Sequence, residues 1–391
     1  MEAYLDNAAT TRALPEVAEL VAKVMTEDYG NPSSLHGKGF AAETIIRNAT
    51  EQIADTLKVD PATIIFTSGG TESNNQALIG TALAYQRAGK HIITTAFEHA
   101  SVAEPLIYLE KQGFEISFLP VESDGGISPD TLKNALRDDT ILVSVMMVNN
   151  EIGVIQDIAD LVKTVKDYNS DIRFHTDAIQ AYGKLPIRPK TLGIDLMSVS
   201  GHKLHGPKGT GFLYIGKDMG NEKLHPYIHG GHQQKNRRSG TENVPGIAGL
   251  GLASQEAYKN IRENYDTVSH LSEEFIQKLK AIDGVVIHAR PEENGLEHFS
   301  PYIISAGIEG IKSEVLLHAL EEKGIYVSSG SACSSNHPGL SDTLTAIGVD
   351  KPYLDSTIRF SLSRFTTEEE LTYTIDCLQN LIPTLRRFTK R

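Results

Sequence analysis

Short runs of β-branched and other apolar residues alternate with helical stretches between Thr63 and about Ile215. The apolar runs are TIIFTS, KHIITTAF, FEISFLPV, ILVSVMMVNN, IRFHTDA, DLMSVS and GTGFLYIG. The helical stretches include ESNNQALIGTALAYQRAG and the amphipathic DIADLVKTVKDYN. Strands separated by helices need crossover connections, which predicts a mostly parallel sheet with helices on both faces.

The pattern changes after the glycine-rich stretch GGHQQKNRRSGTENVPGIAGLG. A long helical pattern runs from about Ala253 to Lys280. Further segments then follow in the order VVIHAR, YIISAGI, a helix from Ser313 to Lys323, TIRFSLSRF and a last helix. We interpret this βαβα-like unit as a second, smaller domain, so the predicted fold class is α/β with a large and a small domain.

Size and charge restrict the possible partners. The 391 residues exceed the length at which single cores usually stop growing, and no window is apolar for long enough to span a membrane. Fifty acidic against 37 basic residues give a net charge of −13, which disfavours binding to nucleic acids or anionic membranes. The basic clusters KNRR and LRRFTKR fit solvated surface better than a local RNA or partner contact. MEAYLDNAATTRALPE lacks the features of a signal peptide, so we expect a cytoplasmic protein.

The two cysteines have different neighbourhoods. Cys377 lies beside a helical stripe of apolar residues that follows a capping box formed by Thr367 and Glu370, so packing explains it. Cys333 lies in SSGSACSS, where no periodicity surrounds it. Cys333 is therefore the candidate reactive thiol, which a reducing compartment would keep free.

A possible anion site follows the first strand of the large domain. In TIIFTSGGTESNN, glycines between strand and helix let backbone N–H groups converge on a phosphate, although the same glycines also fit a simple turn. The stretch matches neither the P-loop nor the dinucleotide-binding fingerprint. Pro207 stands where a P-loop needs lysine in the similar GHKLHGPK, so a nucleoside triphosphate is disfavoured.

Two further residues give this anion site a specific chemistry. Lys203 follows a strand and lies between two histidines, where burial and cationic neighbours lower an amine's pKa, whereas a surface lysine is the alternative. Asp177 ends another strand, and ligands collect outside such strand ends. A phosphate site, a lysine for a Schiff base and a carboxylate for the ring nitrogen are together what pyridoxal phosphate requires.

Histidine and arginine residues add candidates with open alternatives. His99 follows a strand and suits stacking or acid–base work over a cofactor ring, or an ordinary surface position. Pro226 and two glycines keep His225, His229 and His232 from aligning on one helix, which disfavours zinc. Arg359 lies on the polar face of a strand, where it suits a substrate carboxylate or a structural salt bridge.

Ten segments, in order along nearly the whole chain, resemble cysteine desulfurases of the NifS and IscS type, in the class V aminotransferase group of fold-type I pyridoxal-phosphate enzymes. They are YLDNAATT (4–11), YGNPSSLHG (29–37), FTSGGTESNN (66–75), EHAS (98–101), VNNEIGVIQDI (148–158), HTDAIQAYGK (175–184), SGHKLHGPKG (200–209), RRSGTENV (237–244), SSGSACSS (328–335) and STIRFSLSRFTTEEE (356–370). The resemblance implies a large cofactor-binding domain over residues 13–258. It implies a small domain over 1–12 and 259–391 that carries Arg359 and a mobile loop with Cys333.

The resemblance also implies a role for each matching residue. Lys203 would attach the cofactor, Asp177 would pair with its ring nitrogen, His99 would stack on the ring, and Asn150 and Gln180 would bond near its phenolic oxygen. The phosphate would be bound by Gly70, Thr71, Ser200 and His202, and by Thr241 from the other subunit of a homodimer with shared sites. Gly201 would also contact the cofactor. Arg359, with Asn150, would hold the substrate, and Cys333 would accept the sulfur.

The implied reaction converts L-cysteine to L-alanine and passes sulfur, as a persulfide on Cys333, to an acceptor protein. That acceptor would be an iron–sulfur scaffold or a tRNA- or cofactor-thiolating enzyme. No membrane, direct nucleic-acid or intrinsic metal partner is expected, although Cys333 could ligate a transient cluster on an acceptor. A lyase acting on selenocysteine or cysteine sulfinate would share Lys203, Asp177 and Arg359 without depending on Cys333, and a non-enzymatic scaffold would form no alanine.

Overall fold

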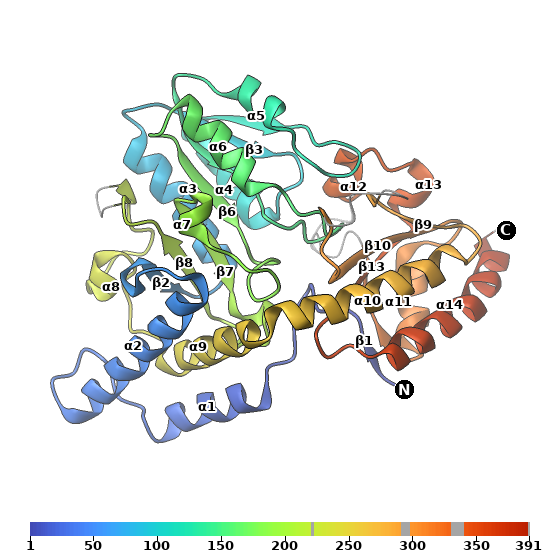
Figure 1. Ribbon diagram of the computed structural model, residues 1–391, viewed down its shortest axis with the longest axis horizontal. Helices are drawn as coiled ribbons and strands as arrows, with labels where there is room; N and C mark the ends of the chain where they lie inside the picture. The colour runs from blue at the N-terminus through green and yellow to red at the C-terminus, as the bar shows by residue number, and fades with distance from the viewer. Residues whose placement is uncertain (220–222, 291–297, 330–339, 390–391) are drawn as a thin grey trace.

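The computed structural model describes residues 1–219, 223–290, 298–329 and 340–389, which form a large and a smaller α/β unit (Figure 1). A seven-stranded sheet forms the centre of the large unit. Its strand order is β2 (Ile64–Thr67), β8 (Gly211–Ile215), β7 (Leu196–Ser200), β6 (Arg173–Asp177), β5 (Thr140–Ser144), β3 (His91–Thr95) and β4 (Glu115–Leu119). Pairing is parallel from β7 to β4, and β8 runs antiparallel to β7 and β2. The predicted α/β class and the seven predicted strands are confirmed.

Helices cover both faces of this sheet because side chains along each strand alternate between two cores. Ile64 and Phe66 of β2 join one core, whereas Ile65 packs with Ala77 on the opposite face. The face of Ile65 is covered by α3 (Gly70–Tyr85) and α4 (Ala100–Lys111). The other face is covered by α2 (Gly37–Leu57), α5 (Pro129–Ala135), α6 (Ile158–Tyr168) and α9 (Val244–Lys259), with α1 (Pro15–Thr26) packed on α9. The short helices α7 (Pro189–Leu192) and α8 (Gln233–Asn236) lie in connections.

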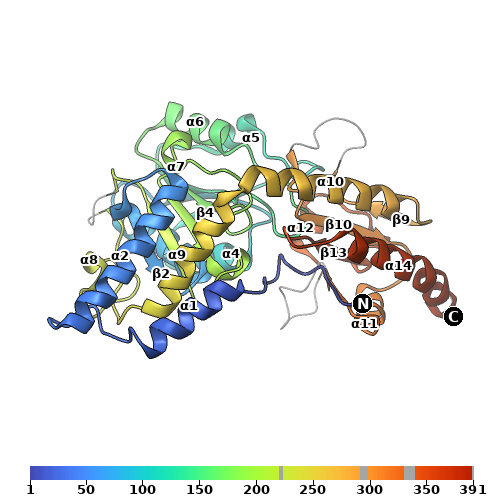
Figure 2. The same cartoon turned by 60° about the horizontal axis from the view of Figure 1, so that its bottom comes forward.

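The long helical pattern that ends at Lys280 is two helices. α9 ends at Lys259 and α10 (Ile261–Lys280) begins after Asn260, whose φ of −131° and ψ of 38° are not helical. The prediction of one helix from Ala253 is therefore wrong at residue 260, because the apolar spacing continues across the break. α9 packs on α1 and α2, whereas α10 packs on elements of the small unit (Figure 2). The predicted domain boundary after residue 258 lies beside this break and stays a prediction.

The small unit is built on a four-stranded sheet. The order is β12 (Ser328–Ser329), β13 (Thr357–Ser361), β10 (Ile303–Ile308) and β9 (Val285–Ile287). The predicted alternation of strands and helices is present, but these strands run antiparallel. Its helices are α10, α11 (Ser313–Glu321), α12 (Asp342–Ala346), α13 (Lys351–Leu354) and α14 (Glu368–Thr389).

The start of α14 confirms the predicted capping box. The backbone N–H of Thr367 donates to Glu370 Oε2 at 2.7 Å, and the N–H of Glu370 donates to Thr367 Oγ1 at 3.2 Å. Cys377 is partly buried against the main core, as its place beside the apolar stripe predicts. No helix in the described ranges is both long and apolar enough to cross a membrane.

The N-terminal segment joins the two units. Strand β1 (Ala3–Tyr4) pairs in parallel with β11 (Ile325–Tyr326) of the small unit. Farther along, the N–H of Asn7 donates to the carbonyl of Ser361, and the N–H of Thr11 donates to the carbonyl of His202 in the large unit. Residues 3–11 therefore run along the boundary between the units and bring their backbone carbonyls to the site described next.

Candidate active site

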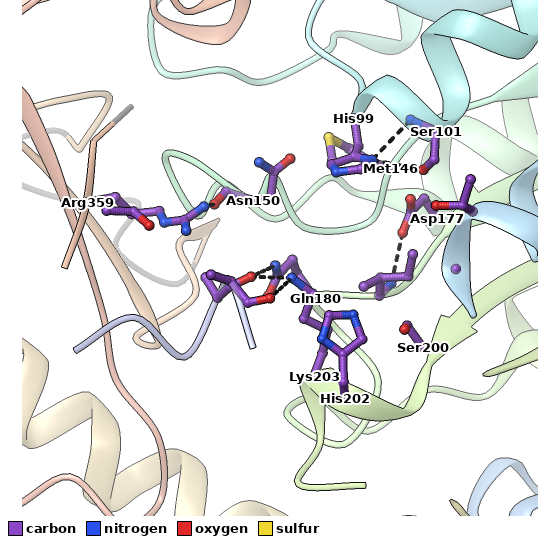
Figure 3. Close-up of a pocket in the computed structure, with 16 residues that line it drawn as sticks. His99, Ser101, Met146, Asn150, Asp177, Gln180, Ser200, His202, Lys203 and Arg359 are labelled. Carbon is purple, nitrogen blue, oxygen red and sulfur yellow. Dashed lines mark hydrogen bonds between the residues drawn. The ribbon is translucent and has the colours of Figure 1, made fainter. Parts of the chain in front are cut away.

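A cavity of about 290 Å³ lies at the carboxyl ends of β6 and β7, between the large unit and β13 of the small unit (Figure 3). Most of the predicted site residues line it: Gly70, Thr71, His99, Asn150, Asp177, Gln180, Ser200, His202, Lys203 and Arg359. The remaining lining residues are Ala8, Ala9, Ser101, Met146, Ile179 and Ser328. The fold thus brings together residues that are separated by up to several hundred positions in the chain.

Two of the predicted residues do not line this cavity in the described part of the chain. Gly201 is buried behind the wall, where a Cβ would lie 2.6 Å from Thr210 Oγ1. Thr241 is exposed on this single chain. Cys333 lies outside the described residues. The roles of Gly201, Thr241 and Cys333 stay predictions.

Asp177 is held by two donors at the end of β6. The Ile179 N–H donates to its Oδ1 at 2.9 Å, and Asn74 Nδ2 donates to its Oδ2 at 2.8 Å. Burial raises the pKa of Asp177 above its ordinary value, and these two hydrogen bonds and the positive charge of Lys203 oppose that effect. The carboxyl group is therefore fixed in the cavity wall, where a cationic N–H group of a ligand would find a partner.

The same asparagine connects Asp177 to His99. Asn74 Nδ2 also donates to Ser101 Oγ at 2.8 Å, and Ser101 Oγ lies 2.8 Å from His99 Nδ1. The backbone N–H of Ser101, which can only donate, reaches His99 Nδ1 at 3.1 Å. His99 Nδ1 is therefore an acceptor, which places the proton of the neutral ring on Nε2. Burial lowers the pKa of His99, so the ring is neutral near pH 7.

The N-terminus of α3 forms one end of the cavity. No side chain in the described part of the chain caps this helix, and Gly70 and Thr71 of its first turn line the cavity. Gly69 has a φ of 152°, which favours glycine, and a Cβ on Gly70 would lie 2.1 Å from Ile179 Cδ1, so a larger residue there would displace the Ile179 side chain in the cavity wall. Ser200 lies beside this helix end, and His202 lines the same cavity. Unused N–H groups, a hydroxyl and the helix dipole together favour an anion such as a phosphate.

His202 is a neutral neighbour of this anion site. Its Nδ1 lies 3.1 Å from Thr10 Oγ1. Burial, with Lys203 and Lys208 as weaker causes, lowers the pKa of His202 to about 4. At neutral pH His202 can therefore offer an anion a hydrogen bond but no charge.

Lys203 points its amine at the N-terminal segment. Its Nζ donates to the carbonyl oxygens of Ala8 and Ala9, the second at 2.7 Å. Gln180 Nε2 donates to the same Ala8 oxygen at 2.9 Å. The backbone of residues 8 and 9 thus holds the amine at the cavity, where a carbonyl compound could reach it.

Arg359 enters the cavity from β13. Its Nη1 donates to the Asn150 carbonyl at 2.8 Å, and its Nη2 lies 3.1 Å from Asp6 Oδ1. The side chain is 4% exposed, and its Nε has no hydrogen-bond partner among the described residues. Asp6 also accepts a hydrogen bond from Ser328 Oγ. The guanidinium is therefore fixed by protein groups and keeps a donor for another acceptor.

Sequence reasoning missed the residues that hold the predicted ones. Asn74 and Asp6 lie in segments that carry the family resemblance, SGGTESNN and YLDNAATT, yet no role was assigned to them. Their partners, Asp177 and Arg359, are 103 and 353 positions away. A polar residue inside such a motif was the available signal, but its partner becomes visible only in the fold.

Comparison with known proteins agrees with this geometry. The model of the aminotransferase class-V family matches residues 3–373. Cysteine desulfurase IscS of Dictyoglomus turgidum is 46% identical over 386 residues, which cover 98% of this chain and 95% of that protein. The IscS of Methanosarcina thermophila is 43% identical over 386 residues, covering 99% and 93%.

Solved structures give the same result. A NifS-like protein has a TM-score of 0.91 at 37% identity, covering 98% of this chain and all of that one. The structure titled "SspA in complex with cysteine" has a TM-score of 0.80 at 32% identity, covering 93% of this chain and 100% of that one. The chain therefore belongs to the aminotransferase class-V family, and within it to the IscS-type cysteine desulfurases.

Proposed function

We propose that this chain is a pyridoxal-phosphate-dependent cysteine desulfurase that converts L-cysteine to L-alanine and keeps the sulfur as a persulfide on Cys333. The observation that carries the proposal is the single cavity in which Lys203, Asp177, Arg359 and the uncapped end of α3 meet. The likeness to IscS proteins and to SspA, which was solved with cysteine, supports the choice of substrate.

The residues of the cavity fit pyridoxal phosphate. The first turn of α3, with Ser200 and His202, would hold the phosphate, and Asp177 would hold the proton of the ring nitrogen. Lys203 would attach the cofactor, Gln180 and Asn150 would lie near its ring oxygen, and His99 would stack on the ring. The bound cofactor supplies an electron sink that stabilises negative charge on the substrate's α-carbon.

The chain's own residues would bind the substrate and move its proton. The Arg359 guanidinium, fixed by Asp6 and the Asn150 carbonyl, would hold the substrate carboxylate through its remaining donors. The Lys203 amine would take the proton from the α-carbon and return it. Neutral His99 would keep its Nε2–H as a donor toward the reacting groups.

Cys333 would carry the sulfur. Its thiolate would attack the sulfur of the bound L-cysteine, so that a sulfur–sulfur bond forms while the carbon–sulfur bond breaks and the Cβ gains a proton. The enzyme thiol and L-cysteine thus give an enzyme persulfide and L-alanine. The outer sulfur would then pass to an acceptor protein, either an iron–sulfur scaffold or a thiolating enzyme, which restores the thiol.

The site would be completed by a second copy of the chain. In the proposed homodimer, Thr241 of each subunit would contact the phosphate bound by the other, which agrees with the exposure of Thr241 on the single chain. The proposed compartment is the cytoplasm, where a reducing environment would keep Cys333 available as a thiol.

The two cysteines provide a matched test. Cys333→Ala should retain the absorbance of bound pyridoxal phosphate but lose alanine formation and persulfide labelling when L-cysteine is added. Cys377→Ala, the same change at the partly buried position on α14, should retain all three. Alanine formation that persists in Cys333→Ala would contradict the proposed sulfur carrier and would favour a lyase that does not use this thiol.

A further inference from the structure

A buried lysine lies behind the cavity. Lys184 follows β6, is 7% exposed, and donates from Nζ to Gln180 Oε1 at 2.9 Å. Its ammonium also lies 5.7 Å from the centre of the Tyr302 ring, which belongs to the small unit. Burying an amine is unfavourable unless it is hydrogen-bonded, so the hydrogen bond to Gln180 offsets part of the cost of burying Lys184.

The contacts of Gln180 determine how its amide is oriented. A lysine ammonium only donates and the Ala8 carbonyl only accepts. Gln180 lies between them, so its Oε1 must face Lys184 and its Nε2 must face Ala8. The second N–H of Nε2 is then available to the cavity that Gln180 lines. With Lys184 present, turning the amide so that Oε1 faces the cavity would break the hydrogen bonds to both Lys184 and Ala8. Without Lys184, the same turn would break only the hydrogen bond to Ala8.

The same contacts reach Lys203. The Ala8 carbonyl accepts from Gln180 Nε2 and from Lys203 Nζ. Hydrogen bonds thus run from Lys184 through Gln180 and Ala8 to the amine that would attach the cofactor. A change at Lys184 can therefore alter the cavity although its own side chain does not line it.

We propose that Lys184 is a positioning residue, which fixes the Gln180 amide so that its N–H, and not its oxygen, faces the cofactor's ring oxygen. The inference rests on the proposed function, because it assigns Gln180 a partner on pyridoxal phosphate. A donor there stabilises negative charge on the ring oxygen, whereas an amide oxygen at the same place would repel it.

The hydrogen bond does not depend on the charge of Lys184. Burial, with the cations Lys203 and Arg359 as weaker causes, lowers the pKa of Lys184 to about 7. His205 and Arg364 border the same small space between the units, together with Tyr302. A neutral amine can still donate an N–H to Gln180 Oε1, and the Ala8 carbonyl still accepts only from Nε2, so we expect the same orientation of the amide on both sides of pH 7.

The test is a double-mutant cycle with Lys184→Met, Gln180→Ala and both changes together. The Kd for pyridoxal phosphate is measured by titrating the cofactor-free protein, and the pH midpoint of the bound cofactor's absorbance change is recorded for each variant. Lys184→Met should raise the Kd about fivefold, the effect of one hydrogen bond, and move the midpoint to higher pH. In the Gln180→Ala background the same change should alter the Kd less than about twofold.

Lys166→Met is the matched control. Lys166 is also partly buried, and it donates to Asp195 and Ile172 near the amino ends of β6 and β7, far from the cavity. Its loss should lower stability without moving the Kd or the absorbance midpoint. If Lys184→Met does not fold, Lys184→Leu replaces it in the cycle.

Two results separate this inference from the function on which it rests. An unchanged Kd and midpoint in Lys184→Met, or an equal effect of that change with and without Gln180, would overturn the role of Lys184 alone. A wild-type chain that does not bind pyridoxal phosphate would overturn the proposed function, and the role of Lys184 with it.

Discussion

At the scale of single residues, Asp177 and Arg359, which would act on a ligand, are each held by a side chain that does not line the cavity. Asn74 joins Asp177 to Ser101, and thereby to His99, through the two N–H groups of one amide. Asp6 and the Asn150 carbonyl hold Arg359 in the same way. Such support fixes the direction of each functional group, so the effect of a substitution depends on both the lost group and its holder.

Replacing Asp177 by asparagine tests this arrangement. Both oxygens of Asp177 accept a hydrogen bond, so the amide nitrogen of the new asparagine would face a donor, either Asn74 Nδ2 or the Ile179 N–H, where an acceptor now lies. The negative charge beside the ring nitrogen would also be lost. We expect kcat for alanine formation to fall on the order of 10²-fold or more. Steady-state kinetics of the cofactor-loaded protein measure this, and a change below about threefold would contradict the role of Asp177.

Glu98 has no proposed catalytic role, so it tests the effect of burial on a carboxyl pKa. Its Oε1 accepts from the Met146 N–H and Thr95 Oγ1, whereas the buried Oε2 has no partner among the described residues. Burial raises the pKa of Glu98 to about 8. The folded chain keeps this proton while the unfolded chain releases it near pH 4.5, so stability is lost as the pH rises from about 4.5 toward 8.

Glu98→Gln should remove that loss. The free energy of unfolding of Glu98→Gln minus that of wild type should rise by roughly 3 kcal/mol as the pH increases from 5 to 8. Urea unfolding of both proteins at several pH values measures the difference. Parallel curves for the two proteins would show that Glu98 does not titrate in this range.

At the scale of elements, the hydrophobic pattern predicted the strands and helices better than it predicted how the strands pair. Each strand of the large sheet follows from its apolar run, but neither the reversed direction of β8 nor the antiparallel sheet of the small unit has a local signal. Strand β1 has two residues, too few to show any period. The break at Asn260 was missed because the apolar spacing continues through it. Local patterns predict elements, whereas pairing depends on contacts between distant segments.

The capping box of α14 gives a prediction for one element. Thr367→Ala removes the hydroxyl that accepts from the Glu370 N–H and should lower the free energy of unfolding by about 1 kcal/mol. Thr384→Ala, the same change at an exposed position inside the same helix, should be neutral or slightly stabilising because alanine favours helices. Chemical unfolding of both variants tests the pair, and equal losses would contradict the capping role.

At the scale of the whole molecule, the candidate site belongs to both units. The sequence resemblance predicted most of the cavity lining, since the motifs lie at strand ends that a parallel sheet gathers at one edge. The contacts of Ala8, Ala9 and Lys184 could not be predicted, because backbone carbonyls and a buried lysine leave no pattern in the sequence.

Buried histidines in both units predict how the molecule responds to acid. Burial lowers the pKa of His175 to about 3 and that of His288 to about 4. The unfolded chain takes up these protons below about pH 6.5 while the folded chain does not, so stability is lost as the pH falls. Between pH 7 and pH 5, the free energy of unfolding of His288→Gln should fall by roughly 2 kcal/mol less than that of wild type. Denaturant unfolding at the two pH values measures this difference.

The N-terminal segment has a consequence for biosynthesis. Residues 3–7 leave the ribosome long before their partners Ile325, Tyr326, Arg359 and Ser361, which are translated hundreds of codons later. The large sheet can assemble earlier, because its strands end by Ile215. The Ala8 and Ala9 carbonyls can therefore take their final places beside Lys203 only after residue 361 has emerged. Until then, a nascent chain would hold a nearly complete large sheet beside an unfinished cavity.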